Sequence, residues 1–182
     1  MIRRLLSQMR RFGQAVRRED GTATAEFVIV FPVLMMILFQ ALEAGWIEVR
    51  QTMLDRALDL TVRELRLGHF TNPTNATLRQ AICDQTAGVI SNCTADMLVE
   101  LTPVDTTTWT MPSPQATCVD RSAKIQPVTT VLQGASDQMM IVRACVIVDL
   151  LFPTTGLGLD LPQDGQGGIQ LVSSSAFVNE PS

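Results

Sequence analysis

The sequence predicts an α+β fold in which a long N-terminal transmembrane helix extends into a small exported domain with a mainly antiparallel sheet and disulfides. Three observations predict this fold. Residues 22–42 are apolar apart from one charge, and 21 helical residues are long enough to cross a bilayer. Residues 96–104 and 138–152 are rich in the β-branched and apolar side chains that favour strands. All four cysteines follow the apolar run.

Charge is divided unevenly along the chain. Residues 1–21 carry six arginines, one glutamate and one aspartate, whereas the other 161 residues carry eight basic and sixteen acidic side chains. The acidic remainder argues against nucleic-acid binding, because phosphates would repel it. A basic segment before an apolar span is typical of a cytoplasmic flank. We therefore expect a basic cytoplasmic leader over residues 1–21, a span in contact with membrane lipid over residues 22–42, and an exported remainder. The alternative, a buried core helix, is disfavoured because the run is apolar on all sides.

The helical pattern continues beyond the apolar run. Residues 43–67 carry charges of both signs, with apolar residues at helical spacing on one face. Gly68 is a natural C-terminal stop after a last turn that contains arginines. Pro32 removes one intrahelical hydrogen bond within the span. One helix is thus predicted over residues 22–67, with its second part, residues 43–67, outside the membrane.

Residues 68–182 are expected to form the exported α+β domain. A second helix is predicted over residues 76–90, with Thr74 or Asn75 as its N-cap. The Gly-rich connection over residues 153–168 is expected to be a flexible turn, since its acidic spacing does not match a calcium-binding EF-hand loop. A three- or four-stranded sheet is expected, with strands over residues 96–104, 138–152 and 169–178.

The cysteines predict two disulfides, because an exported domain reaches an oxidising compartment. Three connectivities are possible, and the pairing of sequence neighbours, Cys83–Cys93 and Cys118–Cys145, is favoured. A zinc site is the alternative, but paired C-x-x-C spacing is absent and the one histidine, His69, lies elsewhere. Since His69 also has no serine or cysteine motif beside it, we expect no catalytic residues, no cofactor, no metal and no small-molecule substrate.

The most specific motif lies where the leader meets the span. Gly21 is followed by four small or neutral residues, then by Glu26 and Phe27, and Pro32 stands six residues after the glutamate. The helix dipole favours a carboxylate near the helix N-terminus.

This motif, G-TATA-EF with the proline of EFVIVFP, resembles the processing site of type IV pilin-like proteins. It is similar to the TadE-like family, the TadE and TadF minor pseudopilins of the tight-adherence, or Flp, pilus. The C-terminal SSSAFVNEPS also resembles the ending of such proteins. The resemblance implies cleavage by a prepilin peptidase between Gly21 and Thr22, and helix assembly through Glu26, Phe27 and Pro32.

The resemblance also implies a biological role. It predicts a non-enzymatic subunit of the bacterial inner membrane, with its N-terminus in the cytoplasm and its C-terminal domain in the periplasm. Its partners would be other pilin-like subunits and the Tad secretion machinery, in pilus biogenesis, adherence and biofilm formation.

Two other interpretations remain open from the sequence alone. An uncleaved signal anchor would hold a periplasmic binding or accessory protein in the membrane. A secretory leader cut after Ala44 would release the domain, although Leu42 is not the small residue that such a site prefers. The three interpretations predict different mature N-termini: Thr22, Met1 and Gly45.

Overall fold

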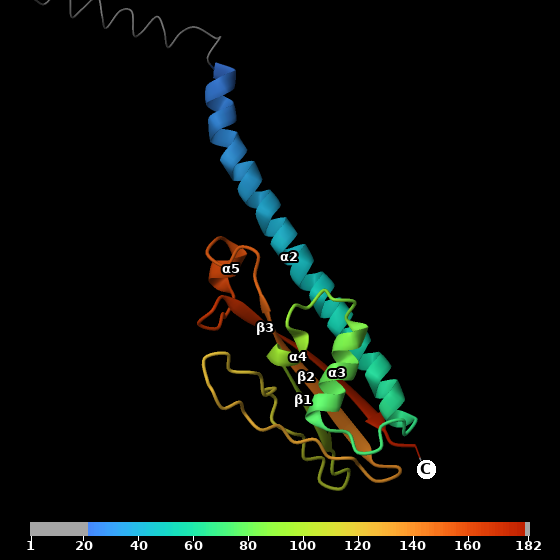
Figure 1. Ribbon diagram of the computed structural model, residues 1–182. Helices are drawn as coiled ribbons and strands as arrows, with labels where there is room; N and C mark the ends of the chain where they lie inside the picture. The colour runs from blue at the N-terminus through green and yellow to red at the C-terminus, as the bar shows by residue number, and fades with distance from the viewer. Residues whose placement is uncertain (1–21, 181–182) are drawn as a thin grey trace, which may run out of the picture. The chain divides into compact units, whose positions relative to one another are not determined.

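The computed structural model describes residues 22–180 (Figure 1). The leader predicted over residues 1–21 lies outside the described residues. The described chain is mixed α+β with a three-stranded antiparallel sheet and two disulfides, which confirms the predicted fold class. Its elements are α2 (Thr22–Arg66), α3 (Asn75–Gln85), α4 (Cys93–Asp96), β1 (Met97–Pro103), β2 (Met139–Asp149), α5 (Leu157–Asp160) and β3 (Gly168–Val178).

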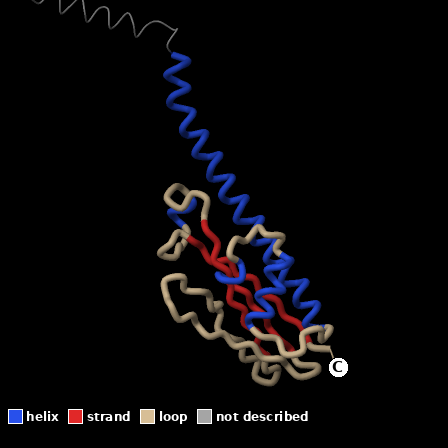
Figure 2. The backbone as a smooth tube through the Cα atoms, in the orientation of Figure 1, coloured by secondary structure: helices blue, strands red, loops and turns tan. Residues whose placement is uncertain are grey.

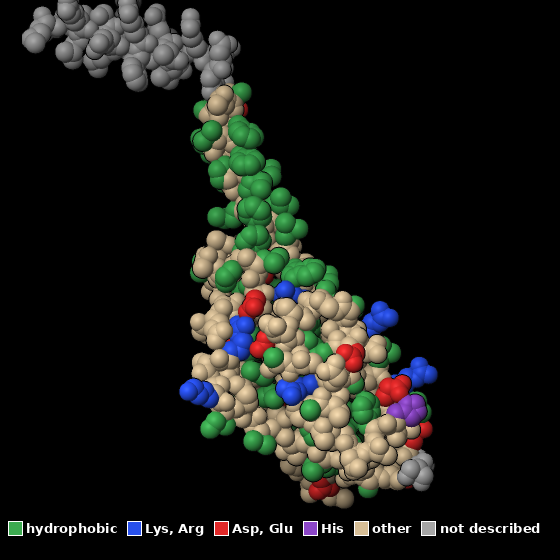
Figure 3. Space-filling model, in the orientation of Figure 1, with side chains coloured by type: hydrophobic (Ala, Val, Ile, Leu, Met, Phe, Trp, Pro, Cys, Tyr) green, Lys and Arg blue, Asp and Glu red, His purple; other side chains and the backbone are tan. Residues whose placement is uncertain are grey.

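The chain divides between Leu42 and Glu43 into two compact units, which we describe separately. The described part of the first unit is the N-terminal half of α2. Its large apolar side chains are exposed, and hydrophobic atoms cover the visible face of this half in Figure 3. The rings of Phe27 and Phe31 stack with their centroids 5.0 Å apart. Among the described helices, α2 is the one that is long and apolar enough to cross a membrane.

In the second unit, α2 ends in a Schellman motif. The N–H of His69 donates to the carbonyl of Glu64 and the N–H of Gly68 donates to the carbonyl of Leu65, both at 3.1 Å. Gly68 adopts the left-handed conformation that this motif requires, with φ of +70°. The predicted stop of the helix is confirmed, one residue earlier than expected, at Arg66.

The strands follow the order β1-β2-β3, and each neighbouring pair is antiparallel (Figure 2). Side chains alternate between the two faces of the sheet, and one face packs against α2, α3 and α4. Apolar side chains that are almost completely buried fill this layer. They include Leu54, Ala57 and Leu58 of α2, Leu78 and Ile82 of α3, Met97 and Val99 of β1, Val142, Ala144 and Val146 of β2, and Leu171 and Phe177 of β3.

The opposite face of the sheet carries a smaller cluster of Leu98, Val119 and Ile147. Val119 belongs to the long connection between β1 and β2, which Figure 2 draws as an extended loop. A disulfide joins Cys118 of this loop to Cys145 of β2, with Cα atoms 5.2 Å apart. The loop therefore covers part of this face of the sheet.

The second disulfide joins Cys83 of α3 to Cys93 of α4. These two disulfides are the pairs favoured from the sequence. Thr74 caps α3 by accepting a hydrogen bond from the N–H of Thr77, but the helix ends at Gln85, so the prediction that it reaches residue 90 is wrong. Left-handed backbone at Ala87 and Gly88 turns the chain back toward Cys93, which requires the helix to stop early.

Candidate functional site

The motif residues lie at the start of α2. Thr22 is the first residue of the helix, and Gly21 lies outside the described residues. Glu26 follows in the second turn, where its side chain is exposed, and Phe27 is 61% exposed. Pro32 lies inside the continuous helix. The structure thus places Glu26, Phe27 and Pro32 on one helix whose surface is available to other helices.

A second glutamate of α2, Glu43, is fully buried. Its carboxylate accepts hydrogen bonds from the backbone N–H groups of Leu151, at 3.1 Å, and Phe152, at 2.8 Å. These residues directly follow β2. Two N–H donors compensate a buried carboxylate for much of the hydration that it loses. Glu43 therefore anchors the start of the second unit's helix to the end of the central strand.

Arg50 lies seven residues after Glu43 and reinforces the same contact. Its guanidinium donates a hydrogen bond to the carbonyl oxygen of Asp149 at 2.6 Å and lies over the ring of Trp46, 5.3 Å from the centroid. Burial lowers the pKa of Arg50, and the negative charges of Glu43 and Asp149 act in the opposite direction. The sequence predicted only that residues 43–67 form a helix with charges of both signs, and it assigned Glu43 no partner. The available signal was an acidic and a basic residue seven positions apart, which share one helix face.

The Gly-rich connection before β3 is held by an arginine. Arg121 donates to both carboxylate oxygens of Asp164, at 2.6 and 2.9 Å, and to Asp149 at 2.6 Å. Asp164 also accepts from the N–H groups of Gln166 and Gly168. These bonds, that from Arg121 first, lower the pKa of Asp164 to about 2. The expectation of a flexible turn missed this network.

Both carboxylate oxygens of Asp164 thus accept hydrogen bonds from protein donors. Within residues 22–180, no three His, Cys, Asp or Glu side chains are grouped so that they could hold a metal ion. His69, the other residue considered for chemistry, is exposed and contacts the carboxylate of Glu64.

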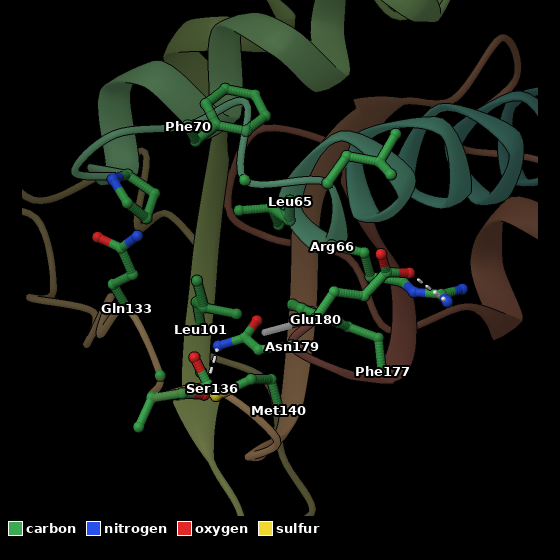
Figure 4. Close-up of a pocket in the computed structure, with 15 residues that line it drawn as sticks. Leu65, Arg66, Phe70, Leu101, Gln133, Ser136, Met140, Phe177, Asn179 and Glu180 are labelled. Carbon is green, nitrogen blue, oxygen red and sulfur yellow. Dashed lines mark hydrogen bonds and ion pairs between the residues drawn. The ribbon is translucent and has the colours of Figure 1, made fainter. Parts of the chain in front are cut away.

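A pocket of about 410 Å³ lies between the end of α2 and the ends of the strands (Figure 4). Apolar side chains from several elements form much of its wall, including Leu65, Phe70, Leu101, Met140 and Phe177. Its two charged lining residues, Arg66 and Glu180, pair with each other at 3.1 Å. The two opposite charges of the lining are therefore paired with each other.

Neither the curated proteins nor the solved structures with which the sequence was compared give a match. A protein-family model does match, over residues 21–63, and its description is TadE-like protein. The matched segment begins at the glycine of the motif and includes both Glu26 and Glu43. It covers α2 up to residue 63 and stops before the sheet. The resemblance of this chain to the TadE-like family is therefore confirmed over residues 21–63.

Proposed function

We propose that this chain is a pilin-like assembly subunit, a pseudopilin, of a Tad/Flp type IV pilus in a bacterial inner membrane. The observation that carries the proposal is the family match, which begins at Gly21 and continues through a helix that starts at Thr22. In this proposal the chain is a structural component rather than an enzyme. It acts in pilus biogenesis, adherence and biofilm formation.

Processing would take place at the N-terminus of α2. A prepilin peptidase cuts between Gly21 and Thr22 and removes the basic leader, residues 1–21. The new α-amino group of Thr22 then pairs with Glu26 of the same or a neighbouring subunit. Within a bundle of helices, this pair offsets part of the free-energy penalty of a carboxylate at the apolar edge. Pilin-like helices would pack against the exposed apolar half of α2, in which Ala23 and Ala25 allow close approach.

The orientation follows from charge. Arginines on the N-terminal side of the span place the N-terminus in the cytoplasm, so that residues 43–182 enter the periplasm. There the long helix continues to Arg66, and residues 68–182 form the periplasmic α+β domain. The partners are the prepilin peptidase, other pilin-like subunits, the Tad secretion machinery and membrane lipid.

The first test is the N-terminal sequence and non-reduced mass of the protein from its native membranes, with and without the host's prepilin peptidase. The proposal expects Thr22 as the first residue, and Met1 when the peptidase is missing. Met1 in both strains would contradict it and would leave an uncleaved, signal-anchored binding or accessory protein. A first residue of Gly45 would indicate a secreted domain.

A second test concerns Glu26 directly. Glu26→Gln keeps the size of the side chain and removes its charge, so it should be processed normally and yet fail to support pilus assembly. The matched control is Glu48→Gln, because Glu48 is an exposed glutamate of the same helix, outside the span. Equal pilus yields from the two variants would exclude the assembly role of Glu26.

A further inference from the structure

The two edges of the sheet differ in how their backbone groups are satisfied. At the β1 edge the carbonyl of Val99 accepts from the side chain of Asn75 at 2.7 Å. The N–H of Leu101 donates to Thr130, and its carbonyl accepts from the N–H of Leu132, both at 2.9 Å. Side chains and the returning loop therefore cover this edge.

The hydrogen-bond register shows which groups of β3 face the other edge. The N–H of Leu150 donates to Gly167 before β3 begins, and the N–H of Asn179 donates to Gln138 after it ends. Backbone groups in an antiparallel ladder alternate in direction, so the odd-numbered residues of β3 face β2. The even-numbered residues direct their N–H and C=O groups outward.

The first part of this outer edge is partly covered, by an isolated antiparallel bridge between Gln163 and Ile169 and by two hydrogen bonds. The carbonyl of Gly168 accepts from the N–H of Asp164 at 2.8 Å, and that of Val172 accepts from the side chain of Gln51 at 3.1 Å. Beyond Val172, no hydrogen bond from residues 22–180 reaches the outward groups of the remaining even-numbered positions, Ser174, Ala176 and Val178. All three of these residues are exposed.

The part of the β3 edge from Ser174 to Val178, which we call the open segment, lacks the usual protection of an edge strand. Natural edges are commonly blocked by lysine, proline or a bulge. From Gly168 to Val178 the strand contains no charged residue and no proline, and its pairing with β2 is continuous. An unprotected edge is a template for one more strand.

A groove of about 560 Å³ lies along the open segment. One wall is the last part of α2, with Asp59, Val62, Arg63 and Arg66, and the other is β3 from Ser175 to Val178. Arg66 is paired with Glu180, but no ion pair within residues 22–180 engages Arg63. The groove thus combines unpaired strand backbone with the side chains of Asp59 and Arg63, neither of which forms an ion pair within residues 22–180.

We propose that this groove binds an extended segment of a different polypeptide, which adds to β3 as a fourth strand. Main-chain hydrogen bonds to Ser174, Ala176 and Val178 would supply the affinity, and alternate side chains would supply the specificity. On one face of the added strand, small or apolar side chains lie beside Ala176 and Val178. On the other face, a carboxylate pairs with Arg63.

A second copy of this chain does not fit the same edge. Gln51 contacts Val172 and Arg66 contacts Glu180, so α2 runs in the direction of β3 (Figure 1). A two-fold pairing of β3 with β3 is antiparallel, so it would point the second parts of the two α2 helices, residues 43–66, in opposite directions. A second β3 would also offer Arg63 no carboxylate, because it contains no charged residue from Gly168 to Val178.

The test uses the full chain in its native membranes, with the photo-crosslinking residue benzoylphenylalanine in place of Ala176. The control places it at Gln170, an exposed residue of the same strand beside the covered part of the edge. We expect an adduct at position 176 with a single extended segment of another polypeptide, identified by mass spectrometry, and none at position 170. No adduct at position 176, or an adduct only with a second copy, would overturn the proposal.

The Ala176→Pro variant distinguishes backbone pairing of β3 with the bound polypeptide from simple proximity of the two chains. It removes an outward N–H and leaves the ladder with β2 intact, because proline is tolerated where an edge N–H faces solvent. With the crosslinker at Val178, this variant should lower the adduct yield about fivefold to tenfold, as expected for one lost hydrogen bond, while Ala176→Ser retains the yield. An unchanged yield would contradict strand addition.

Two measurements keep this result interpretable. The melting temperature shows whether Ala176→Pro folds. If it does not fold, Ala176→Lys places a charge on the same edge and should lower the adduct yield in the same way. The N-terminal sequence of the same preparation reports separately on cleavage after Gly21, so failure of the docking proposal is distinguishable from failure of the proposed function.

Discussion

Two of the glutamates of helix α2 are in opposite situations. Glu26 lies in the N-terminal half, where its side chain is exposed. Glu43 begins the second unit, where its carboxylate is fully buried and accepts two backbone hydrogen bonds. An exposed carboxylate on an apolar helix is available to another molecule, whereas a buried one that is bonded to its own chain is committed to the fold.

The two halves of the helix differ in the same way. In the second unit one face of α2 is buried, with Leu54 completely inaccessible to solvent. In the first half, Ile37 is 66% exposed. One helix therefore performs two tasks, because its second half completes a domain core and its first half retains an apolar surface. The comparison predicts that substitutions in the two halves act on different properties.

The largest effect is expected for Leu54→Ala. Removing a completely buried leucine should lower the free energy of unfolding by about 2–5 kcal/mol through lost burial and a residual cavity. The measurement is denaturation of the full chain in detergent micelles. The matched control, Ile37→Ala in the first half, should change this free energy by less than about 0.5 kcal/mol. Similar losses from both variants would contradict the division of tasks.

Glu43→Ala should have the next largest effect. It leaves the N–H groups of Leu151 and Phe152 without their acceptor and should lower the free energy of unfolding by about 1–3 kcal/mol. Glu43→Gln should lower the free energy of unfolding by less, because the amide oxygen of glutamine still accepts a hydrogen bond. The same denaturation assay applies, with Glu48→Ala as the exposed control. If Glu43→Ala matched that control, the anchor at the end of β2 would have no energetic role.

Acid should lower the free energy of unfolding of the second unit by up to about 2 kcal/mol through Asp164. The folded-state pKa of this carboxyl is about 2, below its ordinary value of 3.8, so the unfolded chain binds the proton first. The contribution of Asp164 is complete above pH 4 and is lost as the pH falls toward 2. Unfolding followed from pH 5 to pH 2 should show this loss, and Asp164→Asn should remove it. An unchanged pH dependence in that variant would show that the pairing with Arg121 is not the source.

The smallest effect on stability is expected for Glu26→Gln. Because the Glu26 side chain is exposed, its neutralisation should change the free energy of unfolding of the domain by less than about 0.5 kcal/mol. Near-ultraviolet circular dichroism of the full chain during denaturation would measure this. A larger loss would mean that the first half of α2 contributes to folding of the domain, which would contradict the division of tasks between the two halves of the helix.

Local patterns were enough to predict much of this fold. Apolar spacing and Gly68 predicted α2 to within one residue at its C-terminus, and β-branched runs predicted the three strands. These elements depend on neighbours in sequence, which a single chain displays. The N-cap of α3 was predicted to be Thr74 or Asn75 for the same reason, because a capping residue bonds to the first turn of its own helix.

The rest depends on contacts between residues far apart in sequence. The carboxylate of Glu43 is satisfied by backbone groups 108 and 109 residues away, and that of Asp164 by an arginine 43 residues away. Nothing in the local pattern specifies either partner. The open edge of β3 is likewise a property of the whole sheet, because strand order decides which strand lacks a neighbour.

The separation in sequence between Glu43 and its hydrogen-bond partners has a consequence for the timing of folding. At about 5–20 residues per second, synthesis of the 108 residues that separate Glu43 from Leu151 takes roughly 5–20 s. For that interval the emerging helix has neither its hydrogen-bond donors nor the sheet that covers Leu54. The nascent chain therefore carries a carboxylate that only water solvates and an uncovered apolar stripe, and this delay is the period in which a chaperone would be of most use.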